Sequence, residues 1–277
     1  MSANGNSILL IGESGVGKTH YGAQLLKRLM KGDGQLRMNG AATNLEPFEA
    51  TMNCLDEGLA AEHTASNVYV DSIWPIADLD GASADLVWPD YAGEQILAIS
   101  KTRRIPEAWR SRVSEAPSWL FLVRLQQTRV TDDIFSKPLS TLQGTVTENQ
   151  DIQISDQARL IELLQILLYI RKSASTKPAL NPRLCVLLSC WDELGEDKLP
   201  EELLRSRMPM LSSFISSTWS EPSVLGLSAL EQSLDPKEYD EDYSIRGPEQ
   251  FGYIVLPDGQ RTPDLTLPIQ HLIAGRI

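Results

Sequence analysis

The sequence has little histidine, little cysteine and a shortage of positive charge. Its 277 residues include three histidines and three cysteines, without the HxxxH or CxxC spacing typical of a zinc site. Three cysteines cannot all pair, and two of them occupy or flank an apolar run, so we expect a reducing, cytoplasmic compartment. Lys and Arg number 25 against 37 Asp and Glu, and the resulting charge of −12 argues against a nucleic-acid partner.

Long hydrophobic runs are also missing. The densest apolar segment, residues 160–170, is interrupted by Glu162 and Gln165 and is too short to cross a bilayer. The first residues lack the basic and apolar regions of a signal peptide, and neither end of the sequence carries a lipidation motif. We therefore expect no membrane partner.

The chain alternates apolar, strand-like segments with amphipathic, helical ones. Its length suggests two domains or one domain with additions. We expect strands at residues 8–11, 119–125, 184–188 and 223–227, and helices at residues 18–31, 156–172 and 200–217. This alternation predicts an α/β fold in which a mostly parallel sheet carries helices on both faces.

The remaining segments are less regular. A short strand is expected at residues 35–38, a helix at 47–61, a hairpin from 67–73 and 84–88, and a mixed-charge helical stretch at 93–113. The polar run 126–155 lacks sustained periodicity, which indicates a functional loop or an insertion. Beyond residue 230 we expect an acidic solvated stretch at 235–242, a strand and hairpin turn at 251–259, and a closing helix at 267–273.

A glycine-rich loop lies between the first expected strand and the first expected helix. It matches the G-x-x-x-x-G-K-[ST] pattern with Gly12, Glu13, Ser14, Gly15, Val16, Gly17, Lys18 and Thr19. Backbone N–H groups of such a loop converge on nucleotide phosphates. Lys18 would reach the β- and γ-phosphates, Thr19 would bind Mg²⁺, and His20 follows as part of the same nucleotide-binding segment. The alternative is a turn that only joins strand to helix.

Three later motifs also lie where expected strands end. Asp90-Tyr91-Ala92-Gly93-Glu94 contains a D-x-x-G pattern, Asp192 closes the segment Ser189-Cys190-Trp191-Asp192, and a third segment is Ser228-Ala229-Leu230. Ligands of open α/β sheets bind at the carboxyl ends of the strands. Each acid could instead cap a turn, but four such motifs in this order favour one nucleotide site.

In this order the motifs resemble those of the Ras-like P-loop GTPases. The resemblance implies a three-layer sandwich around a mostly parallel, six-stranded sheet, formed as a single G domain over residues 1–277. Insertions would lie at about 34–61 and 126–155, and residues 231–277 would extend the C-terminal side. The sequence is also similar to the bacterial double-GTPase family, which is predicted to act in conflict or defence systems.

The resemblance assigns roles to individual residues. Asp90 would hold Mg²⁺ through water, and the Gly93 N–H would sense the γ-phosphate. Glu94 stands where the family often has the glutamine that orients the attacking water, although it could also be an exposed acid. Asp192 would accept the N1–H and the exocyclic amine of guanine. The segment 228–230 would contact the guanine oxygen through its backbone.

The switch I threonine and a catalytic arginine are harder to locate. Thr64 fits the switch best, while Thr43 and Thr51 are alternatives. No arginine lies within a few residues of Thr64. Arg103 and Arg104 are candidates for the catalytic arginine, or members of a solvated helical face.

The expected function is that of a regulatory GTPase that takes GTP to GDP with Mg²⁺, slowly until a protein partner accelerates it. Lys18, Gly93 and Glu94 would carry catalysis. Cys190 replaces the lysine that covers the base in the family, and Trp191 could offer another stacking surface. An ATP-binding P-loop enzyme and a hydrolysis-deficient scaffold remain alternatives.

Overall fold

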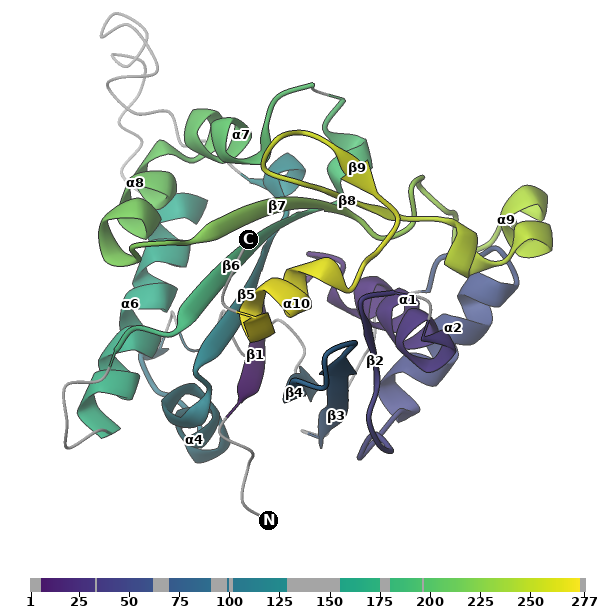
Figure 1. Cartoon of the computed structure of the whole chain (residues 1–277). Coiled ribbons are helices and arrows are strands. Elements are labelled where there is room, and N and C mark those ends of the chain that lie inside the picture. Colours follow the sequence, from purple (N-terminus) through teal and green to yellow (C-terminus); the bar gives the residue numbers. More distant parts are fainter. Residues whose placement is uncertain are drawn as a thin grey trace, which may run out of the picture.

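The computed structural model describes residues 6–32, 34–61, 70–90, 99, 102–128, 155–174, 180–195 and 197–274. These residues form one sheet between two layers of helices (Figure 1). The expected α/β, three-layer architecture is confirmed, but the expected six-stranded, mostly parallel sheet is wrong. The described sheet is mixed and has nine strands in the order β2-β3-β4-β1-β5-β6-β7-β8-β9.

Five neighbouring strands form the parallel centre of the sheet. They are β4 (Ser83–Asp90), β1 (Ser7–Gly12), β5 (Ser118–Val123), β6 (Arg183–Ser189) and β7 (Ser223–Ser228). β1, β5 and β7 are buried along their whole length, because helices cover both faces. Since the five strands are parallel, their carboxyl ends meet at one edge of the sheet.

Short antiparallel strands extend this centre on both sides. β2 (Leu36–Met38) and β3 (Val70–Asp78) lie beyond β4, while β8 (Tyr253–Val255) and β9 (Arg261–Thr262) lie beyond β7. The expected hairpin is confirmed as β3 and β4, both longer than the apolar pattern indicated. The segment 34–61 contains the expected strand, β2, and the expected helix, which ends earlier than predicted, at Asp56.

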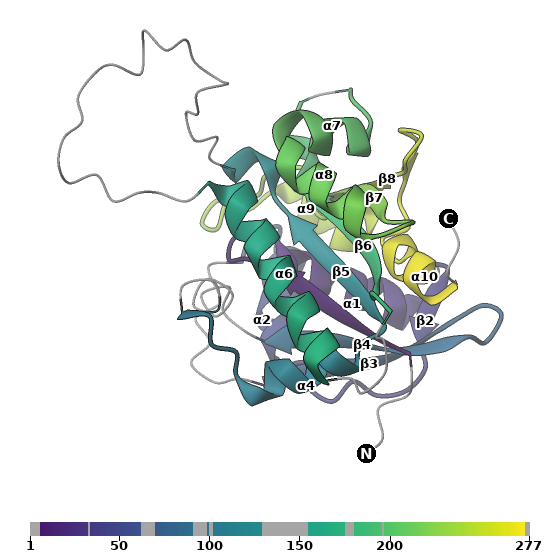
Figure 2. The same ribbon diagram turned by 90° about the vertical axis from the view of Figure 1, so that its left-hand side faces the viewer.

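Helices pack on the two faces of the sheet. One face carries α4 (Glu107–Glu115), α6 (Asp156–Ala174), α7 (Pro200–Arg207) and α8 (Pro209–Thr218). The other carries α1 (Lys18–Lys31), α2 (Glu46–Asp56) and α10 (Leu267–Ala274), with the short helix α9 (Glu241–Arg246) beside α2. Figure 2 views the molecule from the α6 side, where α6 and α8 lie in front of the central strands.

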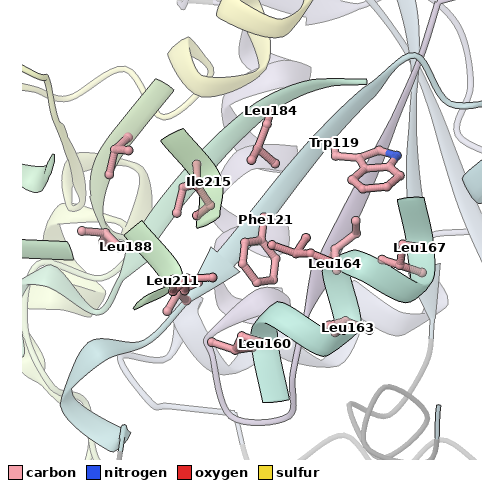
Figure 3. Packing of buried hydrophobic residues seen from close by; sticks show 14 of the residues in the cluster. Trp119, Phe121, Leu160, Leu163, Leu164, Leu167, Leu184, Leu188, Leu211 and Ile215 are labelled. Carbon is pink, nitrogen blue, oxygen red and sulfur yellow. The ribbon is translucent and has the colours of Figure 1, made fainter. Parts of the chain in front are cut away.

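The helix α6 supplies much of the core on its face. Leu160, Leu163, Leu164 and Leu167 are buried against the aromatic side chains of β5, as Figure 3 shows around Phe121. Burying one such side chain contributes about 1.5–3 kcal/mol. This packing fixes the first turns of α6 close to the strand ends that form the site.

Two expected helices differ from the structure for local reasons. The segment 200–217 forms two helices, because Pro209 disfavours a helical conformation at Met208, which has φ −135° and ψ 65°. In the stretch 93–113, the described residues 99 and 102 are helical, and a separate helix, α4, starts after Pro106. Proline, which a periodicity pattern does not register, sets both boundaries.

Two further findings bear on the environment of the protein. Among the described residues, no helix is long and apolar enough to cross a membrane. Cys54, Cys185 and Cys190 are all free thiols.

Candidate functional site

The phosphate loop connects β1 to α1 as the sequence predicts. Gly15 and Gly17 both have φ 78°, a left-handed conformation that glycine adopts without strain. A Cβ atom on Gly12 would lie 3.0 Å from Val16 Cγ2 and 3.2 Å from Leu122 Cβ, so glycine permits the tight turn. No side chain among the described residues caps the start of α1, which leaves the positive end of its dipole directed at the loop.

Lys18 is held inside this loop. Its ammonium group donates a hydrogen bond to the backbone carbonyl of Glu13. Burial lowers the pKa of Lys18 to about 8, although the Glu13 carboxylate acts in the opposite direction. The loop therefore contains a poorly solvated cation, and a phosphate anion would relieve its desolvation.

The lowered pKa of Lys18 predicts that nucleotide affinity depends on pH. Phosphate binds the protonated lysine, so GDP affinity should be highest below pH 8 and should fall as pH rises through about 8 to 9. The same group makes the folded state more stable as pH rises from about 8 toward 10.5, because over that range the unfolded chain binds the additional proton. Calorimetric titrations of GDP at pH 7.0, 8.0 and 9.0 test the first effect, and a flat affinity would contradict it.

Two arginines that belong to no recognised sequence motif anchor the loop. Arg159 of α6 makes a bidentate ion pair with the Glu13 carboxylate, at 2.7 and 2.8 Å. Arg124, directly after β5, donates from Nη1 to the carbonyl of Gly15 at 2.8 Å. The only sequence signal for Arg124 is its position at the end of a buried strand. By contrast, the expected candidate Arg103 pairs with Glu162 of α6 and has a largely exposed side chain.

His20 connects the start of α1 to the segment that precedes β3. Its Nε2 accepts a hydrogen bond from the Ala61 N–H at 3.2 Å, which requires the neutral ring. Burial and the nearby Arg124 lower the pKa of His20, consistent with this form. Ala61 thus lies next to the phosphate loop.

The three candidate switch I threonines differ in whether their side chains could reach a nucleotide. Thr43 is bonded to β3, since its Oγ1 accepts from the Ile73 N–H at 2.9 Å, and Thr51 is buried in α2. Thr64 falls outside the described residues and stays a prediction.

Asp192 and Ser228, two residues expected to bind the base, lie in contact. The Ser228 hydroxyl donates to Asp192 Oδ1 at 2.5 Å and accepts from the Glu231 N–H at 2.9 Å. Asp192 lies in the turn after β6, and Ser228 ends β7, which runs parallel to β6. Ala229 and Leu230 continue from Ser228 at this edge.

Cys190 and Trp191 have structural positions in the same turn. Cys190 has φ 53°, and its Sγ lies 3.6 Å from the position of a Cβ on Gly17, so this turn contacts the phosphate loop. Burial raises the pKa of the thiol to about 12. Trp191 is 4% exposed and covers Gly226 of β7, where any Cβ would lie 2.4 Å from the indole. The interpretation of Trp191 as a stacking surface for the base is therefore wrong.

The expected magnesium ligands are partly placed. β4 ends at Asp90 and β1 at Gly12, each three residues beyond the paired Val87 and Leu9, so both lie at the same sheet edge. Thr19 is in the first turn of α1. Gly93 and Glu94 fall outside the described residues.

The donors in the described part of the chain suit only one kind of cation site. These residues include no group of three or more His, Cys, Asp or Glu side chains that could hold a metal ion. Mg²⁺ commonly takes one or two protein oxygens, substrate phosphates and water. A hydroxyl from Thr19 together with nucleotide phosphates fits that pattern.

Comparison with known families decides the relationship. The family model for Double-GTPase 1 matches residues 9–272, which include every site element described above. The chain belongs to the Double-GTPase 1 family. Membership confirms the resemblance to double-GTPases and supports a GTP-binding P-loop protein. No curated protein matches the chain.

Solved GTPase structures show a distant likeness to this Double-GTPase 1 protein. The bacterial selenocysteine-specific elongation factor EF-Sec is 13% identical, with a TM-score of 0.38, and the match covers 83% of this chain and 26% of the factor. The signal recognition particle receptor SRb-GTP/SRX complex from Chaetomium thermophilum is 16% identical, with a TM-score of 0.40, and the match covers 85% of this chain and 94% of the matched chain. Methanosarcina barkeri Roco2 bound to GDP is 14% identical, with a TM-score of 0.32, and the match covers 82% of this chain and 45% of the matched chain. The chain spans about a quarter of the elongation factor, and at these scores the likeness carries no argument on function.

Proposed function

We propose that this Double-GTPase 1 protein binds GTP with Mg²⁺ and hydrolyses it to GDP as a regulatory switch. The observation that carries the proposal is the contact between Asp192 and Ser228, beside a phosphate loop that holds the buried Lys18. Two polar groups for a base and a cation for phosphates thus share one sheet edge. We extend the proposal to a single G domain over residues 1–277, with additions at both sheet ends.

In this proposal the phosphates lie over the glycine-rich loop. The N–H groups of residues 13–18 donate to the phosphate oxygens, and Lys18 leaves the Glu13 carbonyl to bind the β- and γ-phosphates. Mg²⁺, when bound, neutralises charge that develops between these phosphates. Thr19 would hold it directly, with Asp90 acting through water.

Residues around the γ-phosphate would report the nucleotide state. The His20 to Ala61 hydrogen bond fixes one end of the segment that contains Thr64. Thr64 and the N–H of Gly93 would contact the γ-phosphate and be released after hydrolysis. Glu94 would orient the attacking water, but a carboxylate cannot neutralise charge on the phosphoryl oxygens.

At the other end of the nucleotide, Asp192 would read guanine. Its carboxylate can accept from both the N1–H and the 2-amino group, and adenine offers neither in that arrangement. The Ser228 hydroxyl orients the carboxylate. Backbone groups of Ala229 and Leu230 would contact the guanine oxygen.

Replacing Thr19 with asparagine should separate triphosphate from diphosphate binding. The change removes the hydroxyl that would bind Mg²⁺, whose effect is greatest when a γ-phosphate is present. We expect GTP affinity in Mg²⁺ to fall about tenfold or more and GDP affinity to fall less. Titrations in Mg²⁺ and in EDTA measure the difference. Equal losses for both nucleotides would contradict a metal role for Thr19.

Phosphate release by the purified protein tests the hydrolysis step. No arginine lies within a few residues of Thr64 in the sequence, so we expect turnover well below about one per second, and a protein partner that accelerates it. Several turnovers per second without a partner would contradict this. Tight GTP binding with no release, even in excess enzyme, would favour a scaffold. Faster release from ATP than from GTP would favour an ATP-dependent enzyme.

A further inference from the structure

Arg124 joins the two halves of the candidate site. Its Nη1 donates to the Gly15 carbonyl of the phosphate loop at 2.8 Å. Its Nε donates to Glu193 Oε2 at 3.0 Å, and Nη2 bonds the other oxygen of the same carboxylate. Glu193 follows Asp192 in the turn after β6. One side chain, directly after β5, therefore ties the loop to the turn that carries the candidate base-reading acid.

The surroundings of Arg124 distinguish it from an ordinary surface ion pair. The side chains of Arg124 and Glu193 are 22% and 26% exposed, and the guanidinium has hydrogen bonds to two different elements. The carboxylates of Glu193 and Asp192 lie close enough to stabilise its charge. In this turn Cys190 occupies the position where the Ras-like motif has a lysine, and its thiol is neutral because burial raises its pKa.

We propose that Arg124 is the positioning residue of the nucleotide base site. It holds the Asp192 turn against the phosphate loop and supplies, from just after the neighbouring strand β5, the positive charge that Cys190 does not provide. This inference rests on the proposed guanine-nucleotide function. A base can pair with Asp192 while its phosphates occupy the loop only if the two are fixed at one separation, and a bidentate guanidinium fixes it before the nucleotide arrives.

The affinities of Arg124 variants for three ligands distinguish a positioning role at the base site from a general contribution to the fold. GDP contacts both halves of the site, inosine diphosphate lacks the 2-amino group, and inorganic tripolyphosphate has no base. Arg124→Ala should weaken GDP and inosine diphosphate about tenfold each, because Arg124 does not read the amine. It should weaken tripolyphosphate less, by about threefold at most, because for this ligand only the bond to the Gly15 carbonyl matters. Arg124→Gln, whose amide ends near the position of Nε and is too short to bridge Glu193 and the Gly15 carbonyl, should behave similarly.

Arg159→Ala is the matched control. Arg159 reaches the site through Glu13 of the loop and also pairs with Asp156 of its own helix, so its loss should weaken GDP and tripolyphosphate equally. Thermal unfolding of each nucleotide-free variant checks that it is folded.

Rescue by a second substitution is the sharpest readout. Cys190→Lys added to Arg124→Ala places a cation at the neighbouring position and should restore most of the lost GDP affinity. The inference is wrong if Arg124→Ala and Arg124→Gln keep GDP affinity within about twofold of the unmodified protein. It is also wrong if both variants lose as much affinity for tripolyphosphate as for GDP, or if Cys190→Lys does not restore GDP affinity. The proposed function fails separately if the unmodified protein binds ADP as tightly as GDP.

Discussion

Lys18→Ala is expected to abolish nucleotide binding, with a loss in GDP and GTP affinity of about 100-fold or more. The ammonium group is the one cation inside the phosphate loop that the structure describes, and charge-assisted hydrogen bonds contribute about 1.5–3 kcal/mol each. Fluorescent nucleotide titration in Mg²⁺ measures the loss. Tight GTP binding by this variant would refute the phosphate-loop assignment itself.

A defect in folding would not explain that result. Burial disfavours the Lys18 ammonium in the nucleotide-free protein, so the alanine variant should unfold at the same temperature or higher. Its unfolding temperature should no longer rise with added GDP, since a ligand stabilises only the state that binds it. Lys27→Ala in the same helix is the matched control. That side chain pairs with Asp56 at the surface, so nucleotide affinity should not change.

Asp192→Asn is expected to move specificity from guanine toward xanthine nucleotides. The carboxylate would accept from two donors of guanine, whereas an amide offers one acceptor and one donor, which suits the 2-oxo group of xanthine. Its oxygen can still accept from Ser228, so the turn should be retained. We expect GDP to weaken about tenfold or more and xanthosine diphosphate to bind more tightly than before.

Competition titrations with GDP and xanthosine diphosphate measure this exchange. Asp197→Asn is the control, because Asp197 is an exposed acid shortly after the same turn and should leave both affinities unchanged. Unchanged GTP affinity in the Asp192 variant would exclude this residue as the guanine reader.

The parallel centre of the fold could be predicted because its strands carry a strong local signal. Continuous apolar runs mark β1, β5, β6 and β7, and the helices between them follow. The antiparallel additions were harder. Strands were expected at 35–38 and 251–259, near β2 and β8, but these strands have three residues each and β9 has two, so the sequence does not indicate how they pair. Their place in the sheet depends on backbone pairing that sequence periodicity does not encode.

In the site, too, residues that are contiguous in sequence could be predicted, whereas residues that come together only in the fold could not. The phosphate loop lies within eight consecutive residues and was fully identified from sequence. Arg124 and Arg159 reach it from positions 109 and 146 residues along the chain from their partners in the loop, so no spacing pattern links them to it. Trp191 was misassigned because burial beneath the helices of one face, and not its neighbours in sequence, determines its role.

Direct competition between GDP and ADP for the unmodified protein, in Mg²⁺ at pH 7.5, tests the central claim that this sheet edge binds a guanine nucleotide. The account predicts that GDP binds at least about tenfold more tightly than ADP, because Asp192 can pair with guanine and not with adenine. Equal affinity for the two nucleotides would contradict it.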